Sequence, residues 1–536
     1  MKMEKQSETF TRDDVQLQEL GHKRELDRNF SFLSLLGLSF TLLNTWTALS
    51  ISISVALPSG GPVSVLWGLV TSTLGSLCLS LSLAEFLSAY PTAGGQYHWV
   101  SCICPSWCRR FVTWVTGWVN TGGWTMLSAC SGLLSSEMII GLIALQNPSY
   151  DPKRWHQFLI YLVYSFLGYF GNAFATPWIP YTNKIGLYWS IIGFITTMIV
   201  LLATAAPDYA DASWVFGEFI NDTGWPDGIA WLLGLLQGSF ALTAFDSVVH
   251  MIEELPRANV QGPNVMVSAI VVGAVTGFVF LVVLLFVSGG AVNVQSIIEA
   301  VETPMIKVMY IATKNKAGTI CLTIFPLGCI LFGTLSGFAA SSRMTYAFAR
   351  DRGLPFSSYF ATIHPRLKLP LNALNLTMAV VIVFDLIFLG STTAFNAITS
   401  ASVVALNLSY GIPILVRCLQ GRPKLPYAVF RIPTALGWVI DLFGLSYVIV
   451  TSVLFLFPPS VPATGSSMNY AIVPLTILFL LCIIQWFIKG RHDFEGPQVH
   501  SIGVLQDNPE DELKKIDSQL YGKEDATVER GYYNSS

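Results

Sequence analysis

The feature that most constrains this chain is its long intervals without charge. No Asp, Glu, Lys or Arg occurs from Asn29 to Ala84, and none occurs from Leu442 to Ile488. Each interval can hold two apolar helices, since crossing the hydrocarbon core of a bilayer takes about 20 residues. Turn sequences divide the intervals at Pro58–Pro62 and Pro458–Pro462. The chain is therefore predicted to be an all-α integral membrane protein.

Composition excludes an ordinary soluble protein. Charged residues make up only 12% of the chain and hydrophobic residues 52%, whereas about a quarter of a soluble domain is charged. The sequence has no phosphate-binding loop and no set of nucleophile, histidine and acid. We therefore expect no enzyme activity, no cofactor and no nucleic-acid partner, but a lipid bilayer around the protein.

Twelve membrane spans are predicted between two polar tails, residues 1–30 and 491–536. The spans cover 33–57, 63–87, 111–143, 157–176, 184–206, 229–252, 265–289, 318–346, 372–390, 394–417, 437–457 and 469–488. The N-terminal tail has no secretory signal peptide, so the first span is expected to act as an uncleaved insertion signal.

Two spans are predicted to be broken in the middle. The first carries a run of Asn, Thr and Ser residues around Trp46, and their side chains compete for backbone hydrogen bonds. The sixth carries Asp246 among small and polar residues from Thr243 to Ser247. The interruptions match in position, which predicts an inverted repeat of five spans, about 31–206 and 229–418, followed by extra helices at 437–488.

The loops predict the orientation, because cytoplasmic loops carry an excess of Lys and Arg. One alternating set holds most of the basic residues, and its opposite set includes the acidic loop 207–228. Both termini are therefore expected in the cytoplasm, with the plasma membrane as the expected location and the vacuole as the alternative. The loop 207–228 also contains the sequon Asn221-Asp222-Thr223, a glycosylation candidate on the outer face.

Asp246 is the strongest candidate for function. A carboxylate in the middle of a span costs roughly 3 kcal/mol on insertion scales, so it is normally turned to a bundle interior or cavity. It could pair with a substrate ammonium or carry a proton. The alternative is a structural carboxylate that caps the second half of a broken helix.

Other residues near the two breaks could contact a substrate. Phe240, Phe245 and Trp46 could attract a cationic head group, although single aromatic rings in membrane helices usually serve packing. Hydroxyl, amide and free backbone groups of the breaks could bind a carboxylate or hydroxyl, or could instead join neighbouring helices. The candidates in this second set are Asn44, Thr45, Thr47 and Thr243.

Several further polar residues are candidates for gating or coupling. Glu253 and Glu254 end the sixth span and are expected at an inner gate, and Glu85 ends the second span. Ser341 and Ser342 could face the first span, where related architectures hold a sodium ion, although serine pairs often only pack. Glu137 and Asp385 are buried-acid candidates in unbroken helices, ranked below Asp246.

No metal site is expected. Cys102, Cys104 and Cys108 with His98 resemble a cluster of ligands, but their spacing fits no usual zinc pattern. Small apolar packing residues are the favoured interpretation.

In their order along the chain, these motifs resemble the amino acid–polyamine–organocation transporter superfamily, and within it the fungal amino acid/choline permease branch. The resemblance covers nearly all of the membrane region. The motifs are 44–47 with 59–62, 85–97, 223–225, 245–254, 348–355 and 468–470.

The resemblance implies a five-plus-five inverted-repeat fold, with the substrate between the breaks of spans one and six. It also implies uptake that is usually coupled to protons. Thr47 and Ala48 match the small unwound residues of the family, Phe240 its gating aromatic and Asp246 its acidic position. A lysine that some bacterial relatives place in span five is replaced here by Ser190, which leaves the coupling ion open.

The sequence therefore predicts a permease that imports a small amine-bearing nutrient, such as an amino acid, gamma-aminobutyrate, choline or a polyamine, by proton symport. Sodium coupling is less favoured. A permease for thiamine or another vitamin and a non-transporting nutrient sensor are the alternatives.

Overall fold

The computed structural model describes residues 12–22, 28–147, 149–300, 303–390, 394–426, 428–465 and 468–497. The chain divides into two units, and Arg24–Gly496 forms the helical membrane unit. The other unit comprises Met1–Lys23 and Pro497–Ser536, and its described helix is α1 (Arg12–Glu19). Most of both predicted tails therefore lies outside the described residues.

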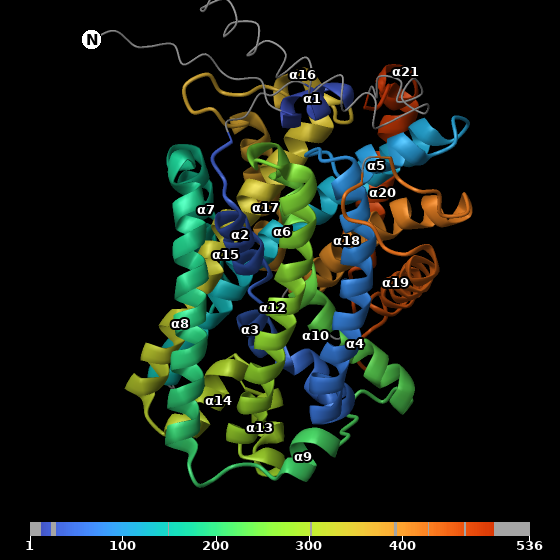
Figure 1. Ribbon diagram of the computed structural model, residues 1–536. Coiled ribbons are helices and arrows are strands. Elements are labelled where there is room, and N and C mark those ends of the chain that lie inside the picture. Colours follow the sequence, from blue (N-terminus) through green and yellow to red (C-terminus); the bar gives the residue numbers. More distant parts are fainter. Residues whose placement is uncertain are drawn as a thin grey trace, which may run out of the picture. The chain divides into compact units, whose positions relative to one another are not determined.

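The described residues of the membrane unit are helical and contain no strand (Figure 1). Among the described residues, ten helices are long and apolar enough to cross a membrane, and α7 and α17 lie where the other two spans were predicted. The spans are α2 (Phe32–Leu43) with α3 (Thr45–Ile51), α4 (Ile53–Ala89), α6 (Arg109–Gln146), α7 (Arg154–Phe174), α8 (Ile179–Ala205), α10 (Asp227–Leu242) with α11 (Ser247–His250), α12 (Ala258–Val287), α15 (Lys316–Arg350), α17 (Leu371–Gly390), α18 (Ala394–Leu419), α19 (Thr434–Leu454) and α20 (Ile472–Gln485).

Short helices lie at the two ends of the unit (Figure 1). One end carries α9 (Ala212–Gly217), α13 (Val294–Ile298) and α14 (Pro304–Thr313), and the opposite end carries α5 (Gln96–Ile103) and α16 (Ser357–Phe360). These helices were missed at the sequence level, because segments of ten residues or fewer show no clear periodicity.

The first span breaks at one residue. Asn44 separates α2 from α3 with φ 44° and ψ 40°, a left-handed conformation that asparagine tolerates better than most residues. Its N–H donates to the Phe40 carbonyl at 2.9 Å, and its carbonyl accepts from the Ala48 N–H at 2.8 Å. The chain therefore changes direction at Asn44 without losing these two backbone hydrogen bonds.

The sixth span breaks over four residues. α10 ends at Leu242 and α11 begins at Ser247, and between them Ala244 has a φ of 74°. The left-handed region costs a non-glycine residue about 1–2 kcal/mol, so the surrounding contacts must hold this conformation. The predicted breaks in spans one and six are both present.

The turn between the first two spans depends on glycine. Gly60 and Gly61 leave helical geometry inside α4, and Gly61 has a φ of 62°. A Cβ atom on Gly61 would lie 2.9 Å from the Ile220 backbone nitrogen, so only glycine suits this position. This is the turn predicted between Pro58 and Pro62.

Packing between the spans repeats after five helices. α6 packs against α18 as α15 packs against α8, and α6 packs against α7 as α15 packs against α17. α4 packs against α10 as α12 packs against α2 and α3. Replacing each of the first five spans by the span five places later reproduces these pairs. Because five is odd, the paired spans run in opposite directions, as an inverted repeat requires.

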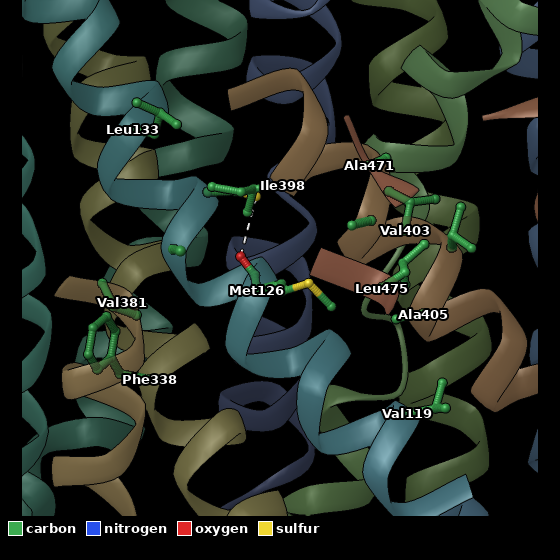
Figure 2. Close-up of a cluster of buried hydrophobic side chains, with 14 of the residues drawn as sticks. Val119, Met126, Leu133, Phe338, Val381, Ile398, Val403, Ala405, Ala471 and Leu475 are labelled. Carbon is green, nitrogen blue, oxygen red and sulfur yellow. Dashed lines mark hydrogen bonds between the residues drawn. The ribbon is translucent and has the colours of Figure 1, made fainter. Parts of the chain in front are cut away.

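A buried apolar cluster holds α6 in the centre of the unit. Figure 2 shows Val119, Met126 and Leu133 of α6 close to side chains of α15, α17, α18 and α20. Apolar burial contributes about 25 cal/mol for each Å² removed from water in soluble proteins, whereas close van der Waals packing joins helices within lipid. The packing of this cluster therefore holds α6 in place beside the two broken spans.

Candidate functional site

A large cavity, called the outer cavity below, extends into the membrane unit from the end that carries α9, α13 and α14. Its volume is about 860 Å³, within the range of small-molecule sites. Its walls come from α4, α6, α10 and α18, from α13 through Gln295, and from loops that include Pro152, Asp222 and Ser460. The cavity can therefore admit a small solute from one side.

A much smaller inner cavity lies between the two helix breaks. Its volume is about 60 Å³, which leaves room for only a few water molecules. Four predicted substrate-binding residues line it, namely Asn44, Ala48, Phe240 and Thr243. Asn44 lines this cavity, and its Oδ1 atom is buried without a hydrogen-bond partner among the described residues.

Two side chains separate the cavities. Leu134 of α6 and Phe240 of α10 line both of them. A solute in the outer cavity must therefore pass these residues to reach the helix breaks. This position suits the gating role that the sequence resemblance implies for Phe240.

Asp246 lines neither cavity. It is fully buried, and four side chains donate hydrogen bonds to its carboxylate or share a proton with it. Oδ2 lies 2.7 Å from Gln96 Nε2, 3.2 Å from Trp124 Nε1 and 3.3 Å from His250 Nε2, and Oδ1 lies 2.6 Å from Tyr410 Oη. The carboxylate thus ties the break in span six to α5, α6 and α18.

His250 joins Asp246 to the backbone of Ala93. Its Nδ1 lies 3.0 Å from the Ala93 carbonyl oxygen, which can only accept, so Nδ1 carries a hydrogen. Its Nε2 lies 3.3 Å from Asp246 Oδ2. A carboxyl group in contact with an imidazole brings together two groups of the kind that proteins use to bind and release protons.

The peptide groups of Ala93 connect this pair to a charged layer. While the Ala93 carbonyl accepts from His250, the Ala93 N–H donates to Glu253 Oε1 at 3.0 Å. Glu253 also accepts from both terminal nitrogens of Arg350, at 3.0 and 3.2 Å. A continuous series of hydrogen bonds therefore runs from Asp246 to the ion pair of Glu253 and Arg350.

A second ion pair completes this layer. Arg343 Nε donates to Glu254 Oε1 at 3.1 Å, and both side chains are buried. We call Glu253, Glu254, Arg343 and Arg350 the closed-end layer, because none of them lines either cavity. The two glutamates were predicted at an inner gate, and their arginine partners were not predicted.

Tyr97 adds a hydrogen bond beside the closed-end layer. Its hydroxyl group donates to Asp351 Oδ2 at 2.8 Å. Burial, followed by the charge of Asp351, raises the pKa of Tyr97 well above its ordinary value. The phenol therefore stays protonated and keeps its donor role.

Glu85 belongs to a different cluster. It accepts from Arg417 Nη1 at 2.8 Å and from Arg422, while Arg422 Nε also donates to Asp441 Oδ2 at 2.7 Å. All four side chains are buried. Buried ion pairs stabilise only when each charge is compensated. This cluster joins α19 to α4 and α18, and among the described residues it makes no hydrogen bond with Asp246.

Several predicted residues serve helix packing in this conformation. Trp46 is fully buried, donates to Ser190 Oγ at 2.9 Å and packs edge-on to Phe280. Phe245 contacts the Tyr410 ring at a centroid distance of 4.7 Å. Neither lines a cavity.

The hydroxyl candidates also bond within the bundle. Thr45 Oγ1 donates to the Ala241 carbonyl at 3.3 Å, which joins the two broken spans, and Thr47 is buried outside both cavities. Ser341 bonds to Thr377 of α17 at 3.2 Å, and Ser342 donates to Ala339 of its own helix at 2.9 Å. The two serines do not bond to the first span in the described structure.

The amide of Asn221 is already bonded. Its Nδ2 atom donates to the Trp225 carbonyl and to Asp227 Oδ1, both at 2.8 Å. A glycan on Asn221 would need these bonds to open. Glycosylation at this sequon stays a prediction.

Comparison with known proteins agrees with this architecture. The profile of a family described as amino acid permease matches residues 30–480. The chain is 34% identical to a protein of Macrophomina phaseolina named for amino acid and polyamine transport, over 81% of this chain and 96% of that one. It is 31% identical to the choline transporter of Saccharomyces cerevisiae, over 88% and 83%, and 29% identical to the 7-keto 8-aminopelargonic acid transporter of the same yeast, over 86% and 92%.

Proposed function

This chain belongs to the amino acid permease family, and we propose that it imports a small amine-bearing nutrient by proton-coupled secondary transport. The family and the transporters among its relatives make it a multi-pass membrane transporter and not an enzyme. The substrate, the coupling ion and the membrane are the parts that we propose.

The proposed transport cycle is supported by a difference between the two ends of the membrane unit: one end is open and the other is closed. The outer cavity reaches one end, and the closed-end layer lies toward the other. Leu134 and Phe240 stand between the outer cavity and the helix breaks. In the proposed cycle, substrate passes Phe240, the outer cavity closes, and the ion pairs of the closed-end layer then separate.

Proton coupling is supported by the Asp246–His250 pair. In the proposed cycle, a proton that binds to this pair changes the charge of the pair. Glu253 responds to that change because the Ala93 backbone is hydrogen-bonded to both His250 and Glu253. A net charge in a buried site weakens or strengthens its neighbouring ion pair at close range. Loading the proton and the substrate together would then favour opening of the closed-end layer.

The substrate class is inferred from chemistry that the relatives share. Choline carries a quaternary ammonium, amino acids and polyamines carry protonated amines, and 7-keto 8-aminopelargonic acid carries an amino group. The free Asn44 Oδ1 in the inner cavity suits an N–H donor. An amine-bearing nutrient or vitamin precursor is therefore the proposed cargo.

The proposed location is the plasma membrane, with both termini in the cytoplasm. Basic residues concentrate in the loops at the closed end, such as Arg257, Arg352 and Arg366. Cytoplasmic loops carry this excess, so the outer cavity would face the outside of the cell.

The experiment is whole-cell uptake of a labelled panel with and without a protonophore. The panel comprises gamma-aminobutyrate, choline, a polyamine, thiamine and neutral amino acids. Accumulation of one compound that the protonophore abolishes is the expected result. Accumulation that depends on a sodium gradient would contradict proton coupling and indicate sodium coupling. A protein that reaches the cell surface but takes up no compound of the panel would contradict the proposed substrate class.

A further inference from the structure

Glu137 differs from the other acids in the described spans. Glu85 and Asp441 are compensated by arginines, and Asp246 is saturated by four neighbours. Asp385 is fully buried and lines neither cavity. Glu137 alone among the carboxylates within these spans lines the outer cavity, where it is partly exposed.

No hydrogen bond or ion pair engages the Glu137 carboxylate among the described residues. The Glu137 side chain is partly exposed to the outer cavity, unlike an acid that faces lipid. The outer cavity thus contains a carboxyl group that no cation pairs with among the described residues. An unpaired acid at membrane depth is a default functional candidate.

Glu137 lies on the route toward the inner cavity. One face of α6 lines the inner cavity with Leu127, Ser131 and Leu134, and continues along the outer cavity with Leu134, Glu137 and Ile140. These positions recur every three or four residues, which places them on one side of the helix. Glu137 is therefore three residues, about 4.5 Å of rise, toward the open end from the barrier residue Leu134.

The other groups of the outer cavity leave this carboxylate available. Lys153 and Arg154 also line the outer cavity, but Lys153 pairs with Asp151 and Arg154 has a partner of its own. Phe240, Phe455 and Phe457 also line the cavity. Aromatic faces together with one carboxylate favour an organic cation, because both the ring quadrupole and the charge attract it.

We propose that Glu137 binds the ammonium group of a cationic substrate in the outer cavity, before the substrate passes Leu134 and Phe240. This inference rests on the proposed function and names its entry site. In this conformation the substrate amine would bind to Glu137, while Asp246 keeps its hydrogen bonds to its four neighbours. Cationic substrates should depend on Glu137 more strongly than zwitterionic amino acids do, because a zwitterion brings its own negative charge.

The first test is uptake kinetics of labelled choline and of a labelled polyamine in E137Q, E137D and D211N at matched surface expression. E137Q should raise KM at least tenfold with little change in the maximal rate, and E137D should recover most of the loss. Asp211 is the matched control, since it is an exposed acid at the same end that lines neither cavity. An unchanged KM in E137Q for every compound taken up would overturn the proposal.

A second test measures binding without transport. Tetrabutylammonium, which is too bulky for the inner cavity, is titrated against the purified full-length protein while the melting temperature is followed. The wild type and D211N should be stabilised and E137Q should not, although all three melt at similar temperatures without ligand. Equal stabilisation of E137Q would reject the site. If no compound of the panel is taken up but this Glu137-dependent binding persists, the proposed function fails and the binding site stands.

Discussion

Both broken spans interrupt a membrane helix, but the polar side chains at the two breaks differ in their hydrogen bonding. The first breaks at Asn44 alone, and the Oδ1 atom of that residue remains without a partner beside the inner cavity. The second breaks over Thr243–Asp246, and its acid is bound on both oxygens by side chains from three other helices and from His250. One break leaves a polar group free for a ligand, whereas the other uses its polar group to hold the bundle. The repeat is therefore symmetric in fold and asymmetric in function.

Replacing Asp246 should have the largest effect. D246A leaves the donors of Gln96, Trp124 and Tyr410 buried without an acceptor, at about 1–3 kcal/mol for each group. D246N presents an amide N–H₂ to donors and removes the proton-binding acid. Both variants should lower concentrative uptake at least about 100-fold, because each 1.4 kcal/mol is a factor of ten.

The measurement is labelled uptake normalised to surface protein. D385N is the matched control, because Asp385 is also a buried membrane acid but lines neither cavity. Normal uptake by both Asp246 variants would show that the second break does not need its carboxylate. The proposed difference between the roles of Asn44 and Asp246 would then be refuted.

Reversing one charge of the closed-end layer should have the next largest effect. E253R places two cations together beside Ala93, and R350E places two acids together, so each single variant should reduce uptake by roughly tenfold or more. The double variant E253R/R350E restores opposite charges and should recover part of the activity. A double variant no better than either single one would mean that the pair does not act as a unit.

A smaller effect is expected at the first break. N44G keeps the left-handed conformation and removes the free acceptor, so KM should rise about fivefold, as for one lost hydrogen bond of about 1 kcal/mol, with the maximal rate preserved. N44A removes the same acceptor and adds backbone strain, so it should also lower the maximal rate. Equal KM values for N44G and wild type would remove Asn44 from the substrate site.

The smallest effect is expected for Trp46. W46F keeps a ring against Phe280 and loses only the hydrogen bond to Ser190, so KM should change less than twofold and stability by about 1 kcal/mol. Uptake kinetics and thermal unfolding would measure both. A large rise in KM at unchanged stability would place the indole in contact with substrate and make the first break richer in ligand contacts than described.

The sequence predicted the scaffold well because its signals are local. Charge-free intervals located the spans, and polar residues within apolar runs located both breaks. The resemblance marked Phe240, which lines both cavities.

The partners of Asp246 were not predictable, since they come from distant elements. Gln96, Trp124 and Tyr410 belong to α5, α6 and α18, and no local pattern shows which face of a mostly apolar helix turns to the centre. The position of Glu137 in the wall of the outer cavity was not predictable either. An acid in an unbroken helix gives no sign in the sequence that a cavity lies beside it.

The connection through Ala93 has a consequence for how this protein can vary. The atoms that bond to His250 and Glu253 are a carbonyl and an N–H of the main chain, so no codon change at position 93 short of proline deletes them. Loss of this connection by substitution must therefore come from His250, from Glu253 or from the residues that flank Ala93. Gly95 has a φ of 56°, and a Cβ atom there would lie 2.7 Å from Val249 Cγ1, so a variant screen should find position 95 intolerant while small residues are accepted at position 93.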